Sequence, residues 1–456
     1  MSSESIAPRS PNTLKSLLAL AWPIVISRAS QTIIGLSDVL LVAKLGPSAV
    51  AATATGAANA FTLLILPMGI VFIVQSYAAQ YFGKGDLVSA RRFGWYGLII
   101  AAATQVAALL SLLAVAPILE LLPYEHDVRE LMTAYLSIRL LSGGAANGIE
   151  ALGSYFGGLG RTWPGMIANL VAMSLNVVLN IVLINGMFGL PVLGVVGSAW
   201  ASSIATFVAF AGFFFYFLRD GKGLSKSKLA WLELKRMLKF GLPSGFNWLF
   251  EFLAYLFFVN VVVAGLGTLP LAAWNSVLAL NSAAFMPAFG LASAGAVLVG
   301  QAIGAGRKDE VPHAVKLTFM ASCVWQTLVA VLYLSIPGVL IAPFSEGPTS
   351  AEFIEMGRRM LMVSTAWQLF DAAVSTFAEA LRAAGDTLYP LVARLIIAWC
   401  IFVPGSLISV RVFHVGEVGA AAWLVIYMGL LAAVLVWRFR RGTWRTLQLT
   451  EPVLEP

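Results

Sequence analysis

The stretch Gln80-Tyr-Phe-Gly83-Lys-Gly85 returns in the second half of the chain as Gln301-Ala-Ile-Gly304-Ala-Gly306, and 301 less 80 gives an offset of 221. Upstream of it, Pro23 returns as Pro243, at an offset of 220 (243 less 23). Gly46 returns as Gly267, at an offset of 221 (267 less 46). A match that keeps its spacing over this distance indicates an internal duplication.

A second set of matches lies downstream of that stretch. Gly160-Arg-Thr162 recurs as Gly385-Asp-Thr387, each with a proline shortly after it, and Gly194-Val-Val-Gly197 recurs as Gly416-Glu-Val-Gly419. Duplicated apolar halves are the usual plan of secondary transporters, in which the substrate path runs between the two repeats.

The composition predicts an integral membrane protein. Hydrophobic residues make up 59% of the chain, charged residues only 11%, and the mean hydropathy is +0.86, which excludes an ordinary soluble domain. We count about twelve apolar stretches, such as those from Leu14 to Val42 and from Leu388 to Ser409, each long enough to cross a bilayer as a helix of roughly 20 residues. Alternation with a period of two is absent, so we expect an all-α fold and not a barrel.

The distribution of basic residues predicts the orientation. Most of the 29 lysines and arginines fall in segments that are cytoplasmic if both termini are, which explains the net charge of +7 without a nucleic-acid partner. The polar stretch 219–239 is the predicted cytoplasmic linker, between an N-terminal lobe at 1–218 and a C-terminal lobe at 240–456. Six spans in each half make the two halves a parallel repeat.

Four carboxylates fall within apolar spans: Asp38, Glu150, Glu251 and Asp371. Placing an acid at the middle of a bilayer costs roughly 2.5 kcal/mol or more, so such a group usually faces a wet cavity, takes a proton or binds a cation. Polar residues accompany these acids at helical spacing, and the resulting stripes should line the space between helices. The stripes are Arg28, Gln31, Gly35 and Asp38; Ser244, Asn247, Glu251 and Tyr255; and Ser364, Gln368, Asp371 and Ser375.

A structural alternative stays open for each acid. Intramembrane arginines, namely Arg28, Arg139 and Arg394, could pair with the carboxylates and lock helices together. The alternative weighs most for Glu150, which is the repeat counterpart of Asp371 and shares its span with Arg139.

Asn176 and Asn180 stand one helical turn apart, and Ser202 follows on the next span. Together with Asp38 they could offer several oxygens to a hard cation such as sodium, whereas a proton needs only one carboxylate. Hydrogen bonding between helices is the commoner use of asparagine in a membrane. Trp248, Phe250 and Phe370 lie close in sequence to the acids and could face a cavity that accepts a lipophilic organic cation.

With these motifs in order, the chain resembles the multidrug and toxic compound extrusion (MATE) transporters, in their bacterial multidrug branch. The resemblance rests on Pro23, on Leu36-Ser-Asp38 with Lys44-Leu-Gly46, on the doubled glycine turns and on Asn176-Val-Val-Leu-Asn180, and it extends from about Leu14 to Arg438. It implies twelve helices in two six-helix lobes around a central V-shaped cavity. It also implies export of amphipathic, mostly cationic compounds by sodium or proton antiport, by a monomer without a cofactor in the bacterial inner membrane.

Carried over by position, the resemblance assigns cation coupling to residues of both lobes. Asp38, Asn176, Asn180 and Ser202 match the N-lobe site, and Glu251 and Asp371 match the C-lobe acids, where sodium is a candidate ligand. Some members have an aspartate where this chain has Asn180. The N-lobe site of this chain therefore carries one negative charge fewer than theirs. For the substrate cavity we expect Gln31, Asn247, Trp248, Tyr255, Gln368 and Asp371.

Two other functions are weighed against export. A flippase for lipid-linked oligosaccharides from the same superfamily would need a cationic cavity, and the acids argue against it. A membrane enzyme would need a nucleophile with a base, or a metal cluster. The three histidines, His126, His313 and His414, are far apart in sequence and form no HExxH motif, so we expect no catalysis.

Overall fold

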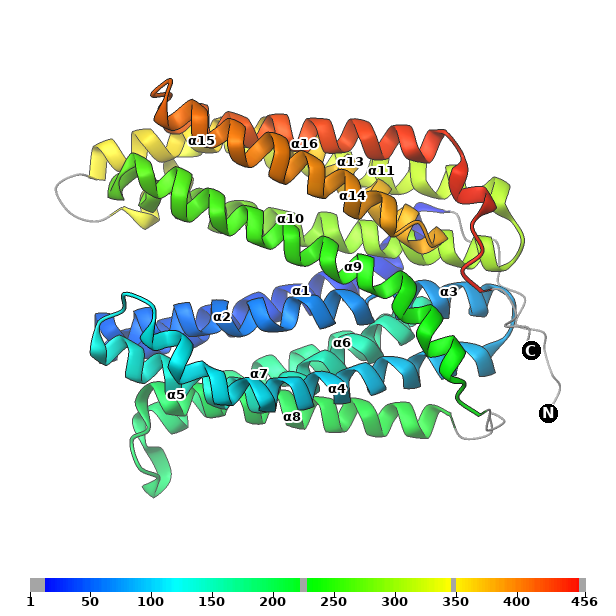
Figure 1. The fold of residues 1–456 in the computed structure, drawn as a ribbon, viewed down its shortest axis with the longest axis horizontal. Helices are drawn as coiled ribbons and strands as arrows, with labels where there is room; N and C mark the ends of the chain where they lie inside the picture. The colour runs from blue at the N-terminus through cyan, green and yellow to red at the C-terminus, as the bar shows by residue number, and fades with distance from the viewer. Residues whose placement is uncertain (1–12, 222–227, 346–349, 451–456) are drawn as a thin grey trace. The chain divides into compact units, whose positions relative to one another are not determined.

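The computed structural model describes residues 13–221, 228–345 and 350–450, and all regular structure in these ranges is helical (Figure 1). Apolar segments in lipid must satisfy their backbone hydrogen bonds internally, and a helix does so within one segment. The predicted all-α fold is confirmed. The predicted cytoplasmic ends at 1–12 and 451–456, and residues 222–227 of the predicted linker, lie outside the described residues.

The helices follow one another in two sets of six segments. The first set is α1 (Leu14–Val42), α2 (Pro47–Val71) with α3 (Val74–Gly83), α4 (Leu87–Glu120), α5 (His126–Leu141) with α6 (Gly143–Gly158), α7 (Trp163–Asn185) and α8 (Gly194–Asp220). The second is α9 (Trp231–Phe257), α10 (Thr268–Gly304), α11 (Val311–Ser335) with the short α12 (Pro337–Ile341), α13 (Ser350–Ala384), α14 (Leu388–Ile396) with α15 (Val403–Arg411), and α16 (Glu417–Arg440). This order is the predicted repeat.

Among the described residues, 10 helical segments are long and apolar enough to cross a membrane, which makes the chain a multi-pass membrane protein. The two segments that complete the twelve are polar or interrupted. α5 and α6 have 16 residues each, with a break at Ser142 between them. α13 carries charged residues along its length, from Glu352 to Arg382.

The turns repeat as closely as the helices do. Gly46 and Gly267, which precede α2 and α10, have φ angles of 109° and 117°. Gly85 and Gly306 both have a φ of 76°. Because side chains other than glycine rarely adopt such angles, the matched glycines of the sequence are matched turns of the backbone.

One irregularity distinguishes the second repeat. The π-helical segment η3 (Phe258–Val263) continues α9, whereas α1 is α-helical to Val42. The offset between the repeats grows from 220 at Pro243 (243 less 23) to 221 at Gly267 (267 less 46), on either side of this segment. A π-helical turn closes its hydrogen bond over one more residue than an α-helical turn, so it accommodates the insertion. A second π-helical segment, η7 (Ile397–Phe402), joins α14 to α15.

The chain forms two compact units, divided inside α1 between Trp22 and Pro23 and inside α9 between Gly245 and Phe246. We call Pro23–Gly245 the N-unit, and Phe246–Glu451 with the residues before Pro23 the C-unit. The helix α9 begins at Trp231, within the stretch predicted as a linker. The limits predicted for the lobes stay a prediction.

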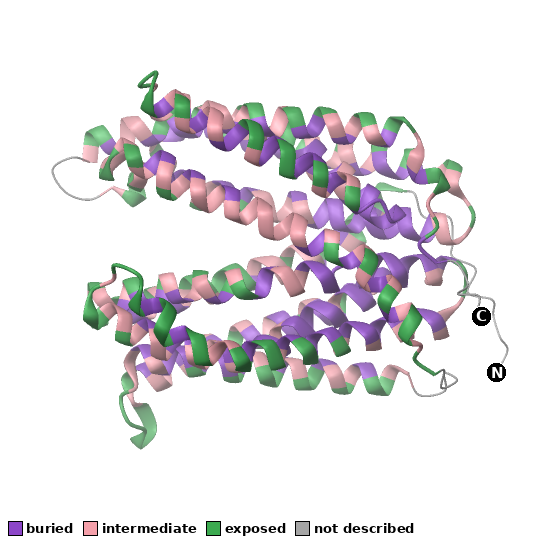
Figure 2. Cartoon of the chain, viewed as in Figure 1, coloured by how far each residue is buried: buried purple, intermediate pink, exposed green. Residues whose placement is uncertain are grey.

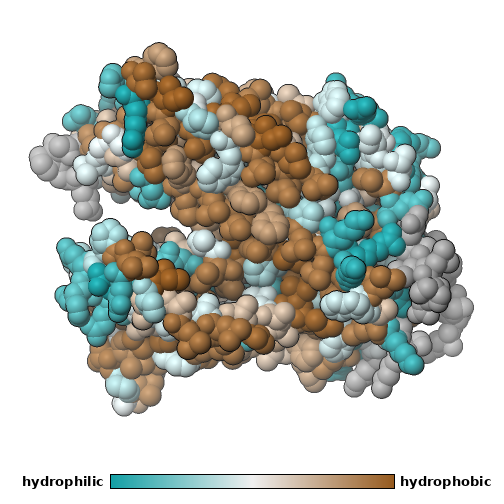
Figure 3. Space-filling model, in the orientation of Figure 1, coloured by the Kyte–Doolittle hydropathy of each residue, from teal (hydrophilic) through white to brown (hydrophobic). Residues whose placement is uncertain are grey.

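Each unit has its own buried centre. In the N-unit, α6 is buried on almost every side, and in the C-unit residues 290–302 of α10 are buried without interruption (Figure 2). Both segments are rich in glycine, alanine and serine, which let membrane helices approach closely. On the face shown in Figure 3, apolar side chains cover the middle of the helices and hydrophilic ones gather near their ends, as expected for lipid-facing helices.

Candidate functional site

In the N-unit, Asp38 of α1 is buried and accepts hydrogen bonds from four side chains. Asn176 and Asn180 of α7 donate from Nδ2 to Oδ1 at 3.0 and 2.6 Å. To Oδ2, the hydroxyl groups of Ser202 on α8 and Tyr135 on α5 donate at 2.6 and 3.4 Å. Every partner is a neutral donor. No lysine or arginine of the described chain lies within ion-pair distance of Asp38.

Helical spacing explains this cluster. Asn176 and Asn180 are four residues apart and therefore lie on one face of α7, where Asp38 meets both. The structure thus brings all four residues predicted for the N-lobe cation site into direct contact. Tyr135 could not be predicted as a member of this cluster, because nothing in the sequence of α5 distinguishes it from other buried aromatic residues.

The cluster could also hold a hard cation after a local change. The Asn180 Oδ1 atom is buried and has no hydrogen-bond partner, and both amide groups currently turn their NH₂ toward Asp38. Amide rotation would present oxygens beside the carboxylate, which are the ligands that hard cations prefer. No group of three or more histidine, cysteine or acidic residues that could hold a metal ion occurs in the described ranges.

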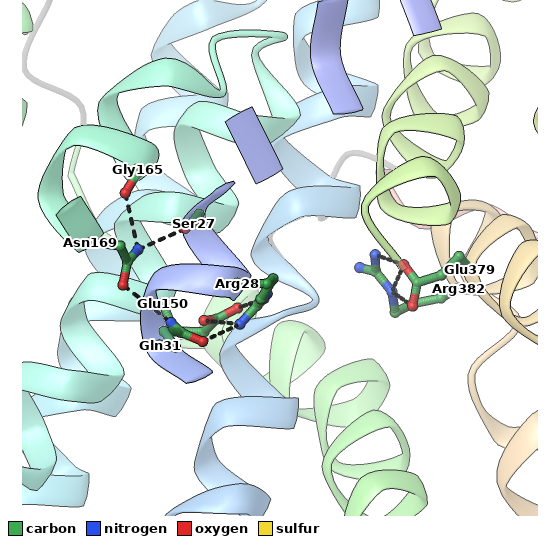
Figure 4. A network of polar contacts seen from close by, with 8 residues as sticks. All are labelled: Ser27, Arg28, Gln31, Glu150, Gly165, Asn169, Glu379 and Arg382. Carbon is green, nitrogen blue, oxygen red and sulfur yellow. Dashed lines mark hydrogen bonds and ion pairs between the residues drawn. The ribbon is translucent and has the colours of Figure 1, made fainter. Parts of the chain in front are cut away.

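Nearly three turns before Asp38 on the same helix, Arg28 forms a two-pronged ion pair with Glu150 of α6, with N–O distances of 2.6 and 3.0 Å (Figure 4). Arg28 also donates to Gln31 at 3.3 Å, and Gln31 donates to Asn169 of α7 at 3.2 Å. Asn169 in turn donates to Ser27 at 2.8 Å. For Glu150 the structural alternative is therefore realised, with Arg28 and not Arg139 as its partner.

In the C-unit, Glu251 of α9 forms an ion pair with Arg394 of α14. The arginine side chain is 6% exposed and the glutamate side chain 39%. Arg394 Nε has no hydrogen-bond partner. This pair also realises the structural alternative, and another cation at Glu251 would compete with Arg394 for the carboxylate.

The second C-unit acid has different surroundings. Asp371 of α13 is buried and accepts a hydrogen bond from Gln326 of α11 at 3.0 Å, between Nε2 and Oδ2. Gln326 Oε1 and Ser322 Oγ, one turn apart on α11, are buried without a hydrogen-bond partner. Within the described part of the chain, no cation pairs with Asp371, and it shares no partner with Glu251.

The predicted cavity residues divide between the units. Gln31 belongs to the N-unit, and the other five belong to the C-unit. Gln368 donates to Asn281 of α10, and Tyr255 accepts from Trp274 at 3.3 Å. Trp248 meets Phe289 edge to face, and Asn247 Oδ1 is buried without a hydrogen-bond partner. Their role in a cavity stays a prediction.

These features define a polytopic membrane protein of two six-segment repeats with carboxylates inside the membrane helices. The chain belongs to the MatE family, whose model matches residues 23–182 and again residues 243–408. The starts of the two matches give an offset of 220 (243 less 23), which agrees with the duplication seen in the sequence. The resemblance drawn from the motifs is confirmed.

Curated relatives align with this chain over almost its full length. The probable multidrug resistance protein NorM of Pseudomonas putida is 28% identical over 446 residues, which cover 94% of this chain and 95% of that protein. The probable multidrug resistance protein NorM of Thermotoga maritima is also 28% identical, over 95% of this chain and 94% of that protein.

Solved structures show the same fold. An outward-facing multidrug resistance MATE family transporter of the MOP superfamily aligns with a TM-score of 0.87 at 19% identity, over 98% of this chain and 100% of that one. A MOP superfamily transporter from Pyrococcus furiosus aligns with a TM-score of 0.86 at 18% identity, over the same shares of the two chains.

Proposed function

We propose that this chain is an efflux transporter that exports amphipathic, mostly cationic compounds in exchange for a cation, which is sodium or a proton. The proposal draws on membership of the MatE family and on the multidrug resistance relatives. We further propose that it works as a monomer in the bacterial inner membrane, without a resident cofactor and without catalysing a covalent reaction.

One observation carries the proposal. Asp38 and Asp371 are both buried in membrane helices, and each is held by neutral donors. A carboxylate in this setting has no permanent counter-ion to balance its charge, so binding a proton or a small cation relieves the cost of burying it. Such a group can exchange its cation during a transport cycle.

Coupling requires that ion and cargo favour different states, or that they compete for the same carboxylate. Competition is the simpler mechanism, and we place it at Asp371 first. At Glu251, Arg394 acts as a tethered counter-cation that any other cation must displace. Displacing Arg394 from Glu251 leaves a buried guanidinium without a partner, which costs free energy. This cost favours movement of α9 relative to α14.

The test uses purified protein in liposomes with a fluorescent cationic dye and an imposed sodium or proton gradient. We expect Asp371→Asn to insert and fold as the wild type does but to reduce gradient-driven dye movement to the level of empty liposomes. Asp127→Asn is the charge-matched control, because this acid is 85% exposed at the start of α5. Export by the Asp371→Asn variant at the wild-type rate would refute the assignment.

The wild-type protein separates the remaining choices. Dye movement under a sodium gradient at fixed pH indicates sodium coupling, and movement under a proton gradient without sodium indicates proton coupling. If neither gradient moves the dye or any related organic cation, the proposed function is wrong. Mass spectrometry of the recovered dye tests for a covalent product, which would indicate an enzyme.

A further inference from the structure

We infer that the C-terminal end of α16 binds an anionic phospholipid headgroup through Arg440 and Arg441, beside Trp437. This inference concerns the C-unit alone. It does not depend on the proposed export activity.

The end of α16 is held in a defined shape. Gly442, with a φ of 77°, turns the chain into the 3-10 turn η8 (Thr443–Thr446). Trp444 stacks on Phe439 with ring centres 5.4 Å apart, and its Nε1 donates to the Phe439 carbonyl at 3.0 Å. The turn thereby fixes the backbone on both sides of Arg440 and Arg441, so that their side chains extend from a rigid segment of the chain.

Four arginines gather at this end, and acids neutralise two of them. Arg438 pairs with Asp386 at 2.7 Å, and Arg445 pairs with Asp309 at 2.8 Å. Arg440 and Arg441 are exposed, and no carboxylate of the described chain lies within ion-pair distance of either. The guanidinium of Arg441 lies 5.2 Å from the centre of the Trp437 ring, which is 52% exposed. Two adjacent residues therefore carry uncompensated positive charges, and the second of them, Arg441, lies against an exposed aromatic ring.

The location indicates a lipid as the partner. Glu417–Arg440 is a candidate membrane span, so its last turn lies at the depth of the headgroups. Tryptophan favours this interface, and arginine matches phosphate oxygens with two parallel hydrogen bonds. An anionic headgroup such as phosphatidylglycerol supplies the missing negative charge, whereas phosphatidylcholine brings its own cation. Clusters of basic residues at the end of a membrane helix attract anionic lipids on this basis.

The N-unit supplies a contrast. Arg219 is the counterpart of Arg441, because 441 less 219 is 222, the offset between Gly197 and Gly419. It is followed by Asp220, which pairs with Arg161 at 2.8 Å. Because that acid is already paired, Arg219 is left as a single uncompensated arginine, which should bind an anionic lipid more weakly than two neighbouring ones.

The experiment titrates detergent-solubilised full-length protein with short-chain phosphatidylglycerol and counts bound lipids by native mass spectrometry. We expect the double variant Arg440→Gln, Arg441→Gln to bind this lipid roughly 25-fold more weakly, since each basic residue contributes about 1 kcal/mol at an anionic surface. The control is Lys44→Gln with Arg219→Gln, which removes the same charge from exposed positions of the N-unit. We expect the control to remain within about twofold of the wild type, as do non-interacting surface substitutions.

Three results would overturn the inference. The Arg440, Arg441 variant could bind phosphatidylglycerol as the wild type does, or the control could lose as much affinity, which would indicate bulk charge. Phosphatidylcholine or inorganic phosphate could also bind with equal affinity, which would exclude recognition of an anionic lipid. Thermal unfolding of both variants in the same detergent shows that each is folded before it is titrated.

Discussion

The N-unit and the C-unit have the same order of helices and turns but carry different charges at matching positions. Gln31 and Glu251 match at an offset of 220 (251 less 31), as do Pro23 and Pro243. Asn169 and Arg394 match at an offset of 225 (394 less 169), as do Gly160 and Gly385. The neutral hydrogen bond between Gln31 and Asn169 in the first repeat therefore stands where the second repeat has the Glu251–Arg394 ion pair.

The other acids follow the same logic. Glu150 corresponds to Asp371 (371 less 150 is 221), and Arg28, which neutralises Glu150, corresponds to Trp248 (248 less 28 is 220). Asp371 lacks an arginine partner because the second repeat has an aromatic residue at that position.

The position of Asp38 changes as well. Its counterpart at an offset of 220 (258 less 38) is Phe258, the first residue of the π-helical segment η3, whose ring packs 5.0 Å from that of Phe402. Of the four acids predicted from the sequence, each unit thus has one neutralised by an arginine and one held by neutral donors. The acid held by neutral donors is on α1 in the N-unit and on α13 in the C-unit. The two repeats therefore kept the same helix order, while these acids came to lie on helices that do not correspond.

The largest loss of stability should follow Arg28→Met. This change leaves the Glu150 side chain, 9% exposed, charged without a partner. Removing one member of a buried pair costs about 3–5 kcal/mol. Denaturation by SDS, followed by circular dichroism, measures the loss. The double variant Arg28→Met, Glu150→Gln should recover most of it, and no recovery would show that Arg28 stabilises the fold by packing alone.

The C-unit pair should respond unequally to removal of its two members. Glu251→Gln leaves a guanidinium that is 6% exposed, and we expect a loss of about 3 kcal/mol, the lower end for a buried pair. Arg394→Met leaves a carboxylate that is 39% exposed and can be solvated, so about 1 kcal/mol is expected. The same SDS titration compares them, and equal losses would contradict the role of residual exposure.

Arg394→Met should also change ligand binding if Arg394 competes for Glu251. We expect tetraphenylphosphonium to bind about tenfold more tightly, because the tethered cation no longer occupies the carboxylate. Arg411→Met, which removes an exposed arginine at the end of α15, is the control and should leave the affinity unchanged. Calorimetry in detergent measures both.

The shared backbone is tested by glycine substitutions of smaller effect. Gly46→Ala and Gly267→Ala should each cost about 1–3 kcal/mol, because φ angles of 109° and 117° are strained for alanine. An added Cβ meets nothing within 4 Å at Gly46, and at Gly267 its nearest atom is 3.8 Å away in Pro270, so the cost is conformational at both. Gly35→Ala, inside α1 with open space, should be neutral or stabilising. Unequal losses of stability for Gly46→Ala and Gly267→Ala would contradict the structural equivalence of the two turns.

The fold was predictable from the sequence because its determinants are periodic or repeated. The length of each apolar stretch predicts a membrane-spanning helix, and doubled glycines such as Gly85 and Gly306 mark equivalent turns. The N-lobe cluster was predictable where helical spacing fixes a face, as for Asn176 and Asn180. The choice of partner for an acid was not, because Arg28 and Arg139 both lie in membrane helices and only the folded structure shows that Arg28 of α1 reaches Glu150 of α6.

The smallest effect should follow Tyr135→Phe, which removes the longest hydrogen bond to Asp38, at 3.4 Å. Asp38 keeps its other three donors and the phenyl ring fills the same space, so we expect a loss of at most about 1 kcal/mol. Ser202→Ala is the comparison within the same cluster. It removes a 2.6 Å bond to the carboxylate and also the acceptor for Asn176 Nδ2, so about 1.5–3 kcal/mol is expected. Thermal unfolding in detergent ranks the two variants, and a larger loss for Tyr135→Phe would mean that α5 contributes more to the Asp38 cluster than its contact distance indicates.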